Sequence, residues 1–209
     1  VVLLANPNDF DVMGIRETNG SQVYFSFVVT LQEYEDINEL TDLEGESIVF
    51  ADRLSTSGSL SATFALKQAG LAIGGAPSGD PEDYTGQWSD HDTAKQQLFN
   101  RDEVVAQGTY GDNIIDHIPL DQFPERVEER SSAYEDRAAL DAPKEPVCDL
   151  LHVSSPIPSS PIITASDWEH PLRPEIQEAI VNIEPGTLRE PDGDVDAPIT
   201  AVGPGTVDD

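Results

Sequence analysis

The chain has 209 residues, with 40 Asp and Glu against 11 Lys and Arg, and a formal net charge of −29. Nucleic acids are recognised by clustered Lys and Arg, and anionic lipids by basic segments, so this charge excludes both as partners. Apolar residues make up 38% of the chain and fall in periodic segments, so we expect a folded protein and not a disordered one.

The acidic residues are spread along the whole chain instead of gathered in a tail, and lysine is rare. Concentrated salt tolerates such a surface, because the Debye length falls to about 3 Å at 1 M and the repulsion between carboxylates is screened. We therefore predict a halophilic source, with an acidic interaction domain as the alternative. Cys148 is the single cysteine, which excludes a disulfide within the chain, and no stretch of the sequence approaches the about 20 apolar residues of a membrane span.

Strands and turns are predicted along the first part of the chain. Residues 1–6 form a continuous apolar run, typical of a strand buried on both faces. Residues 23–30 are rich in β-branched and aromatic side chains and predict a long strand. Between them, residues 19–21 read Asn-Gly-Ser, which favours a hairpin turn and is also a glycosylation sequon. Further expected elements are a helical turn within 34–43, a strand at 47–51, a helix at 59–69 closed by Gly70, and a loop over 74–81.

The second part of the chain continues the alternation of helices and strands. Residues 174–183 carry apolar side chains at the i, i+3, i+4, i+7 spacing of an amphipathic helix. This alternation predicts an α/β fold with mainly parallel strands, whose ligands bind at the carboxyl ends of the strands. The other expected elements are a helix from Ser89 to Asn100, a strand at 104–106, a loop and a charged helix within 119–139, a strand at 147–153, a Ser/Pro loop at 154–161, an extended segment at 162–164, and a Gly/Pro/Asp-rich remainder from 185.

Three consecutive hydroxyls, Ser55, Thr56 and Ser57, stand before Gly58 where a predicted strand leads into a helix. The first-turn N–H groups of a helix have no partner within it, and the helix dipole adds about half a positive charge. Such a helix start can bind a tetrahedral oxyanion without Lys or Arg. The alternative is simple capping by Ser55 or Ser57, worth about 1 kcal/mol.

Two other segments could contribute to the same chemistry. His91 lies in the first turn of the helix that Ser89 or Asp90 would cap, where it could donate a hydrogen bond to an oxyanion. A surface histidine without function is the alternative. The rigid loop at 154–161 carries hydroxyls between prolines, and its alternative is a crossover between lobes without ligand contact.

These elements, in this order, resemble the phosphate/phosphonate substrate-binding proteins of ABC transporters, which have the type II periplasmic-binding-protein fold. The similar segments are residues 42–46 (the family's DLxGK, with Glu46 for Lys), 55–58 (STSG), 66–71 (LLKxAGI), 90–92 (GHD), 156–161 (PPIPxDP) and 23–26 (GYYS). The resemblance as a whole covers roughly residues 1–185.

The resemblance implies two α/β lobes joined by two crossover strands, with the first lobe incomplete because its opening βα units are missing. Residues 1–28 and 162–209 would form what remains of the first lobe, and residues 29–161 the second. The implied ligand-binding residues are Ser55, Thr56, Ser57, Gly58 and His91, with Tyr24 lining the cleft from the other lobe and with Ser160 and Asp112 at positions where the family carries acidic residues.

Departures from the family pattern bear on the ligand. Ser160 replaces the aspartate of PxDP, an acidic residue expected after the His91 helix falls near Gly111 or Asp112, and Val104 replaces the aspartate of NGxxD. Fewer carboxylates at the tail end of the pocket disfavour a cationic aminoalkyl phosphonate. We therefore expect phosphate, phosphite or a small phosphonate with a neutral tail.

The function implied is a solute-binding protein that captures an oxyanion for an ABC permease outside the cytoplasmic membrane, anchored through an N-terminal segment that is missing here. No cofactor, no metal and no enzymatic activity are expected. Residues 192–196 alternate carboxylates but lack the glycine and the terminal Glu of a calcium loop. Ser57, His91 and Asp92 could not act as a triad, because an adjacent His and Asp do not orient each other. The alternative function is a cell-surface structural or sensory module that keeps the fold without transport.

Overall fold

The computed structural model describes residues 9–17, 21–71, 83–131, 133–182 and 201–203. The chain divides into two compact units: unit 1 comprises Val1–Tyr24 and Pro158–Asp209, and unit 2 comprises Phe25–Ile157. The chain passes from one unit to the other at 24/25 and at 157/158, and the predicted lobe boundaries, 28/29 and 161/162, each lie four residues further along the chain. The assignment of the units to the lobes of a binding protein stays a prediction.

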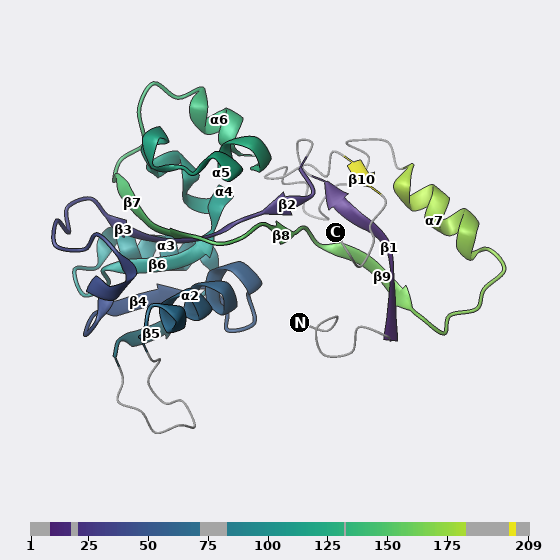
Figure 1. The fold of residues 1–209 in the computed structure, drawn as a ribbon, viewed down its shortest axis with the longest axis horizontal. Helices are drawn as coiled ribbons and strands as arrows, with labels where there is room; N and C mark the ends of the chain where they lie inside the picture. The colour runs from purple at the N-terminus through teal and green to yellow at the C-terminus, as the bar shows by residue number, and fades with distance from the viewer. Residues whose placement is uncertain (1–8, 18–20, 72–82, 132, 183–200, 204–209) are drawn as a thin grey trace. The chain divides into compact units, whose positions relative to one another are not determined.

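Unit 2 contains a five-stranded sheet with the order β5-β4-β6-β3-β7, in which β6 lies between β4 and β3 (Figure 1). β4 is parallel to β5 and β6, whereas β3 is antiparallel to β6 and β7. The prediction of mainly parallel strands is therefore correct for all strands of this sheet except β3. The exception arises because the chain enters unit 2 along β3 and leaves along β7, so the two neighbours run in opposite directions. The strands are β3 (Ser26–Leu31), β4 (Ser47–Phe50), β5 (Thr85–Trp88), β6 (Ala106–Tyr110) and β7 (Cys148–Val153).

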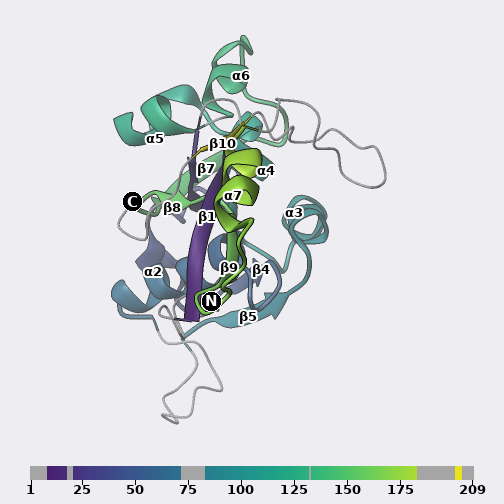
Figure 2. The same cartoon turned by 90° about the vertical axis from the view of Figure 1, so that its right-hand side faces the viewer.

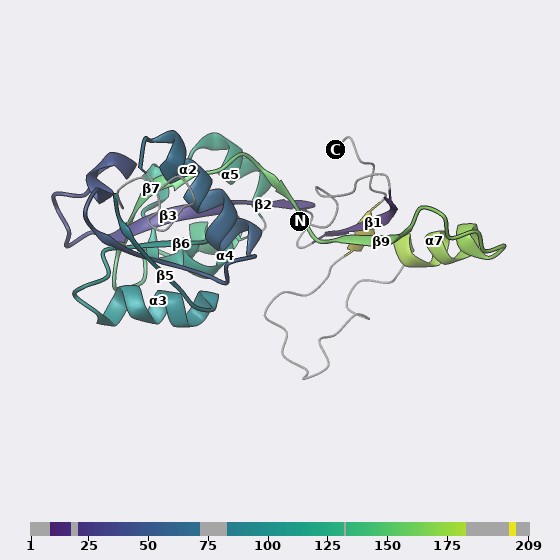
Figure 3. The same cartoon turned by 90° about the horizontal axis from the view of Figure 1, so that it is seen from below.

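Both faces of this sheet are covered, which explains why every residue of β3 is buried and why the strand is mostly apolar. Val28 packs with Ile48, Phe50 and the helix α2 (Ala62–Gln68), whereas Phe27 and Val29 pack on the other face with the helix α3 (His91–Asn100). Figure 3 shows α2 and α3 on opposite sides of the sheet. The sheet therefore separates two apolar cores.

Short helical segments complete unit 2, and two of them differ from the prediction. The helix expected at 59–69 begins earlier, as a π-helical turn η3 (Thr56–Ser61) that continues into α2, and it ends as expected at Gly70, whose φ is +93°. The single charged helix expected within 119–139 is divided into α5 (Glu125–Arg130) and α6 (Tyr134–Ala138), because Ser131 has an extended backbone. The remaining segments are η2 (Leu40–Leu43), α4 (Gly111–Ile114), η4 (Ile115–His117) and η5 (Leu120–Gln122).

The strand predicted at 23–30 is also divided. It forms β2 (Val23–Tyr24) and β3, interrupted at Phe25, whose carbonyl accepts a hydrogen bond from the Gly111 N–H at 2.8 Å. β2 pairs with β8 (Ile157–Pro158), which falls inside the segment predicted to be a Ser/Pro loop. Both short strands stand next to the points where the chain changes unit.

Unit 1 contains a three-stranded antiparallel sheet with the order β10-β1-β9. Its strands are β1 (Phe10–Glu17), β9 (Pro161–Ala165) and β10 (Ala201–Gly203). The helix predicted at 174–183 is present as α7 (Arg173–Val181), which lies along β1 (Figure 2). Arg173 forms an ion pair with Asp11 of β1. The strand predicted at 1–6 and the calcium-like segment 192–196 lie outside the described residues, as does most of the predicted turn at 19–21.

Within the described residues, no helix has the length and apolar character needed to cross a membrane. Cys148 is free and buried in the core of unit 2, and burial raises the pKa of its thiol to about 12.

Candidate functional site

The three hydroxyls of the predicted oxyanion motif lie beyond the carboxyl end of β4, where the chain turns into η3. Ser55 caps this helix start: its Oγ accepts a hydrogen bond from the Gly58 N–H at 3.1 Å. The Ala51 N–H donates to the Gly58 carbonyl at 3.1 Å, which ties the turn to the end of the strand. The capping alternative is therefore correct for Ser55, but capping uses only one acceptor of this hydroxyl.

Thr56 and Ser57 carry polar groups that have no hydrogen-bond partner among the described residues. Thr56 is exposed, and Ser57 is buried with 4% of its surface accessible. In the part of the chain that the structure describes, their backbone N–H groups and side-chain hydroxyls make no hydrogen bond. The Ser57 carbonyl accepts a hydrogen bond from Ser26 Oγ at 2.6 Å, which fastens the helix start to β3. The turn is thus held in place while two amides and two hydroxyls stay unpaired.

His91, from the second predicted helix start, lies beside the first. Its Nε2 is 3.2 Å from Ser55 Oγ, and Asp90 caps α3 by accepting the Thr93 N–H at 2.8 Å. A Cβ on Gly58 would lie 2.6 Å from His91 Cε1 and 2.4 Å from Ala51 Cβ. Glycine at position 58 therefore allows the imidazole to pack directly against the helix start.

The other side of the imidazole is held by β6. His91 Nδ1 is 3.0 Å from Thr109 Oγ1, and Tyr110 meets the ring edge-on with a centroid distance of 4.7 Å. Burial lowers the pKa of His91, against the carboxylates of Asp92 and Asp90, which raise it. The side chain is therefore a neutral imidazole near neutral pH.

Two residues of this site, Thr109 and Asn113, were not predicted, and neither was a neighbouring pair, Arg53 and Trp88. The Thr109 hydroxyl donates to Asn113 Oδ1 at 3.2 Å, at the carboxyl end of β6. The Arg53 guanidinium lies 3.8 Å from the centroid of the Trp88 ring, whose Nε1–H donates to Ser59 Oγ at 3.1 Å. A signal for Thr109 existed, since β4 and β6 are parallel neighbours whose carboxyl ends meet at one edge of the sheet. Arg53 stands two residues before Ser55 and supplies a positive charge that the helix-start argument did not require.

The remaining predicted site residues are not all brought together. Asp112 is exposed on α4, next to Asn113 in the chain. Tyr24 and Ser160 belong to unit 1, so their part in a common site stays a prediction. Two departures from the family pattern have a packing reason: Val104 is fully buried in the core, and a Cβ on Gly111 would lie 3.0 Å from Phe27 Cζ.

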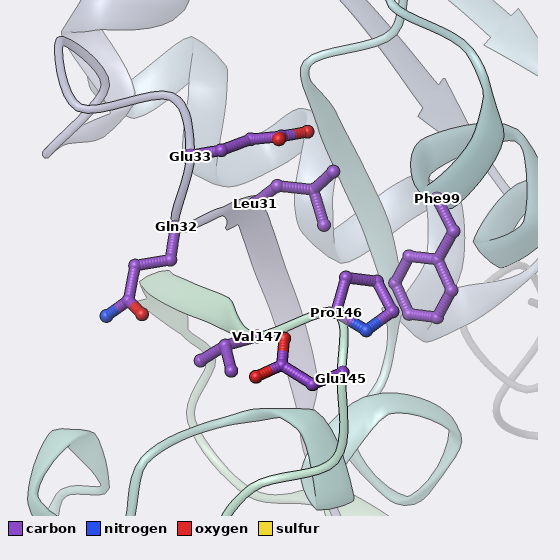
Figure 4. A pocket seen from close by; sticks show the side chains of 7 residues that line it. All are labelled: Leu31, Gln32, Glu33, Phe99, Glu145, Pro146 and Val147. Carbon is purple, nitrogen blue, oxygen red and sulfur yellow. The ribbon is translucent and has the colours of Figure 1, made fainter.

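A separate hollow of about 500 Å³ lies at the opposite end of the sheet, near the end of β3. Figure 4 shows the Leu31 and Pro146 side chains between the carboxylates of Glu33 and Glu145. These two carboxylates disfavour an oxyanion there, and the hollow shares no residue with the site at Ser55. Among the described residues, no group of His, Cys, Asp and Glu is arranged to hold a metal ion.

Comparison with known proteins gives one family. Residues 1–196 match the model of the family described as the periplasmic substrate-binding protein of the phosphonate ABC transporter. A comparison with curated proteins gives no match.

Solved structures share the fold at low sequence identity. XAC2383 from Xanthomonas citri, bound to ATP, is 12% identical with a TM-score of 0.64, over 99% of this chain and 69% of its own. A binding-protein component of an ABC phosphonate transporter from Pseudomonas aeruginosa is 13% identical with a TM-score of 0.57, over 98% and 60%. PhnD1 from Prochlorococcus marinus, in complex with methylphosphonate, is 18% identical with a TM-score of 0.54, over 87% and 60%. The chain thus spans 60 to 69% of the length of these proteins, and the predicted α/β fold of the type II periplasmic-binding class is confirmed.

Proposed function

The chain belongs to the family of periplasmic substrate-binding proteins of phosphonate ABC transporters, and we propose that it captures a small phosphorus oxyanion at the start of η3. The family is one of binding proteins and not of enzymes, in agreement with the prediction from the sequence. It also implies a location outside the cytoplasmic membrane. Delivery to an ABC permease, and anchoring of the protein at the membrane, are further parts of the proposal.

The observation that supports this ligand class is the set of unpaired donors at Thr56 and Ser57, beside the imidazole of His91. Two backbone N–H groups at a helix start combine with the helix dipole to favour a negative charge. Two hydroxyls add donors that rotate to meet the oxygens of a tetrahedral group. Arg53, close by in the chain, adds a positive charge in a protein whose net charge is −29.

Gly58 has an indirect role in this proposal. It has no side chain to bind a ligand, but it allows His91 to approach the helix start. Tyr24, Ser160 and Asp112 would meet the rest of the ligand. Because Ser160 is not acidic, we propose phosphate, phosphite or a phosphonate with a neutral tail such as methylphosphonate.

Calorimetric titration in molar KCl with phosphate, phosphite, methylphosphonate and sulfate tests this function. We expect at least one of the phosphorus oxyanions to bind. In the double variant Ser57→Ala with His91→Ala, the affinity should fall at least a hundredfold, since each hydrogen bond to a charged group is worth about 1.5–3 kcal/mol.

Ser61→Ala is the matched control, because Ser61 lies in the same helical turn and makes no hydrogen bond with its side chain to another described residue. Its affinity should equal that of the unaltered protein. Unchanged affinity in the double variant would refute the site. Failure of all four ligands to bind would refute the function and favour the structural or sensory module.

A further inference from the structure

A chain of side-chain hydrogen bonds leads from the helix start through His91 to α4. His91 lies between Ser55 Oγ, 3.2 Å from Nε2, and Thr109 Oγ1, 3.0 Å from Nδ1. The Thr109 hydroxyl donates to Asn113 Oδ1 at 3.2 Å, and Asn113 Nδ2 donates to Asp92 Oδ1 at 2.9 Å. The Asp92 carboxylate, which ends this series of hydrogen bonds, can only accept them. The NH2 group of Asn113 therefore faces Asp92, and the amide oxygen faces Thr109.

These directions determine which nitrogen of His91 carries the proton. The Thr109 hydroxyl has a single hydrogen, and it donates that hydrogen to Asn113 Oδ1. Toward His91 Nδ1 the hydroxyl oxygen can therefore only accept a hydrogen bond. The proton therefore lies on Nδ1. On the other side, Ser55 Oγ accepts the Gly58 N–H and donates its own proton to Nε2. Nε2, the nitrogen that faces the proposed ligand site, is an acceptor.

We propose that Thr109 and Asn113 are positioning residues that hold His91 in this tautomer, so that the site binds an oxyanion together with one proton. The inference rests on the proposed function. When an oxyanion accepts the hydrogen bond of the Ser55 hydroxyl, that hydroxyl no longer donates to His91 Nε2. The lone pair of Nε2 then faces a negatively charged oxygen of the ligand. A proton must then lie between them, and it comes either from an O–H of the ligand or from the solvent.

The charged groups around the imidazole are compatible with uptake of a proton. Asp90 and Asp92 on α3 favour the charged ring, and Lys95 lies 3.8 Å from Asp92 and donates to the Asn113 carbonyl at 2.9 Å. From β6, Tyr110 presents its ring edge-on. Burial outweighs the two carboxylates and lowers the pKa of His91, whereas a bound anion adds a further negative charge that raises it.

This arrangement discriminates between oxyanions by their protons. Phosphate retains at least one hydrogen throughout the neutral range and can donate it to Nε2, whereas sulfate carries none. Sulfate must therefore bind with a proton from the solvent. By linkage, its affinity should fall about tenfold for each pH unit above the pKa of His91 in the protein without anion, until the higher pKa of the complex is reached.

Two measurements test the inference. Nitrogen-15 NMR of the imidazole, recorded without added anion, should show His91 protonated at Nδ1. Calorimetry near neutral pH, above the lowered pKa of His91, should show a tenfold loss of sulfate affinity per pH unit, with one proton taken up, and a phosphate affinity that changes less than threefold over the same unit.

Two variants of Thr109 separate positioning from a merely structural role. Thr109→Val keeps the shape but removes the acceptor, so the Nδ1 tautomer should no longer dominate and the pH dependence of sulfate binding should flatten. Thr109→Ser retains the hydroxyl and should restore both. Protonation at Nε2 in the unaltered protein, or a Thr109→Val variant with an unchanged tautomer and pH dependence, would overturn the inference. If neither anion binds, the proposed function and the linked proton uptake both fail, while the NMR comparison still decides the role of Thr109.

Discussion

The two units of the chain differ in how much apolar surface they bury. Unit 2 contains two apolar clusters, one on each face of its sheet. In unit 1, the buried apolar side chains among the described residues are Met13 and Ile15, both on β1. β9 buries none of its residues fully, and α7 buries none, with Ile176 37% exposed. The proposed oxyanion-binding residues on η3 and α3 therefore lie beside a sheet whose two apolar clusters are built from residues of unit 2.

The difference matters for the site because a binding geometry must be held by a packed support. Phe50, Ala62 and Gly108 show how closely this support is packed: a Cβ on Gly108 would lie 2.7 Å from Ala62 Cβ and 2.9 Å from Phe50 Cδ1. The start of the helix therefore packs closely against β6, and this contact requires small residues such as Gly108 and Ala62. We expect the positions of the N–H and hydroxyl donors of Thr56 and Ser57 to depend on this packing within unit 2.

The largest expected effect compares one phenylalanine from each unit. Phe27 is fully buried in β3 and lies 6.1 Å, ring to ring, from Phe123, whereas Phe10 at the start of β1 is only half-buried. Phe27→Ala should lower the free energy of unfolding by about 3–5 kcal/mol, because it opens a cavity in the core. Phe10→Ala should cost about 1 kcal/mol. Denaturant titration in molar KCl measures both, and equal losses would show that unit 1 has a core as well packed as that of unit 2.

The next prediction separates stability from binding within unit 2. Gly58→Ala places a methyl group against His91 and Ala51, so the imidazole must move, and oxyanion affinity should fall at least tenfold with a loss of stability of about 1–3 kcal/mol. Gly70 at the end of α2 has a φ of +93° and no atom within 4 Å of an added Cβ. Gly70→Ala should cost about 1 kcal/mol through backbone strain and leave the affinity unchanged. If Gly58→Ala and Gly70→Ala changed the oxyanion affinity equally, Gly58 would affect binding only through the stability of the protein.

The sequence predicted those parts of the site that depend on local signals. A run of hydroxyls before Gly58 indicates a helix start, and Asp90 indicates a cap, because capping involves residues only a few positions apart. Only the family resemblance implied that the start of η3 and the start of α3 lie side by side. Thr109 and Asn113 were missed because Thr109 contacts His91 from β6 while Asn113 contacts Thr109 and Asp92, and nothing in their own neighbourhood in the sequence marks these contacts.

The fold was predicted with a similar limit. The positions of most strands and of α2, α3 and α7 follow from apolar periodicity, which is local. The direction of β3 does not, because it is set by where the chain enters unit 2 and by its antiparallel pairing with β7. The early start of the first helix at Thr56 was missed because π-helical geometry has no sequence signal of its own. A halophilic source stays a prediction, since it rests only on the amount and spread of acidic residues and on the scarcity of lysine.

The smallest expected effect concerns unit 1, where an ion pair joins α7 to β1. Arg173 and Asp11 are partly exposed, with 28% and 46% of their side chains accessible. A double-mutant cycle with Arg173→Gln and Asp11→Asn should give a coupling of about 0.2–1 kcal/mol in dilute buffer. In molar KCl the Debye length falls to about 3 Å, so the coupling should vanish. Arg101→Gln, at an exposed position without a carboxylate partner among the described residues, is the control. A coupling above about 2 kcal/mol that survives molar salt would mean that the pair is shielded from water, and that unit 1 is held together by a desolvated contact where unit 2 relies on apolar packing.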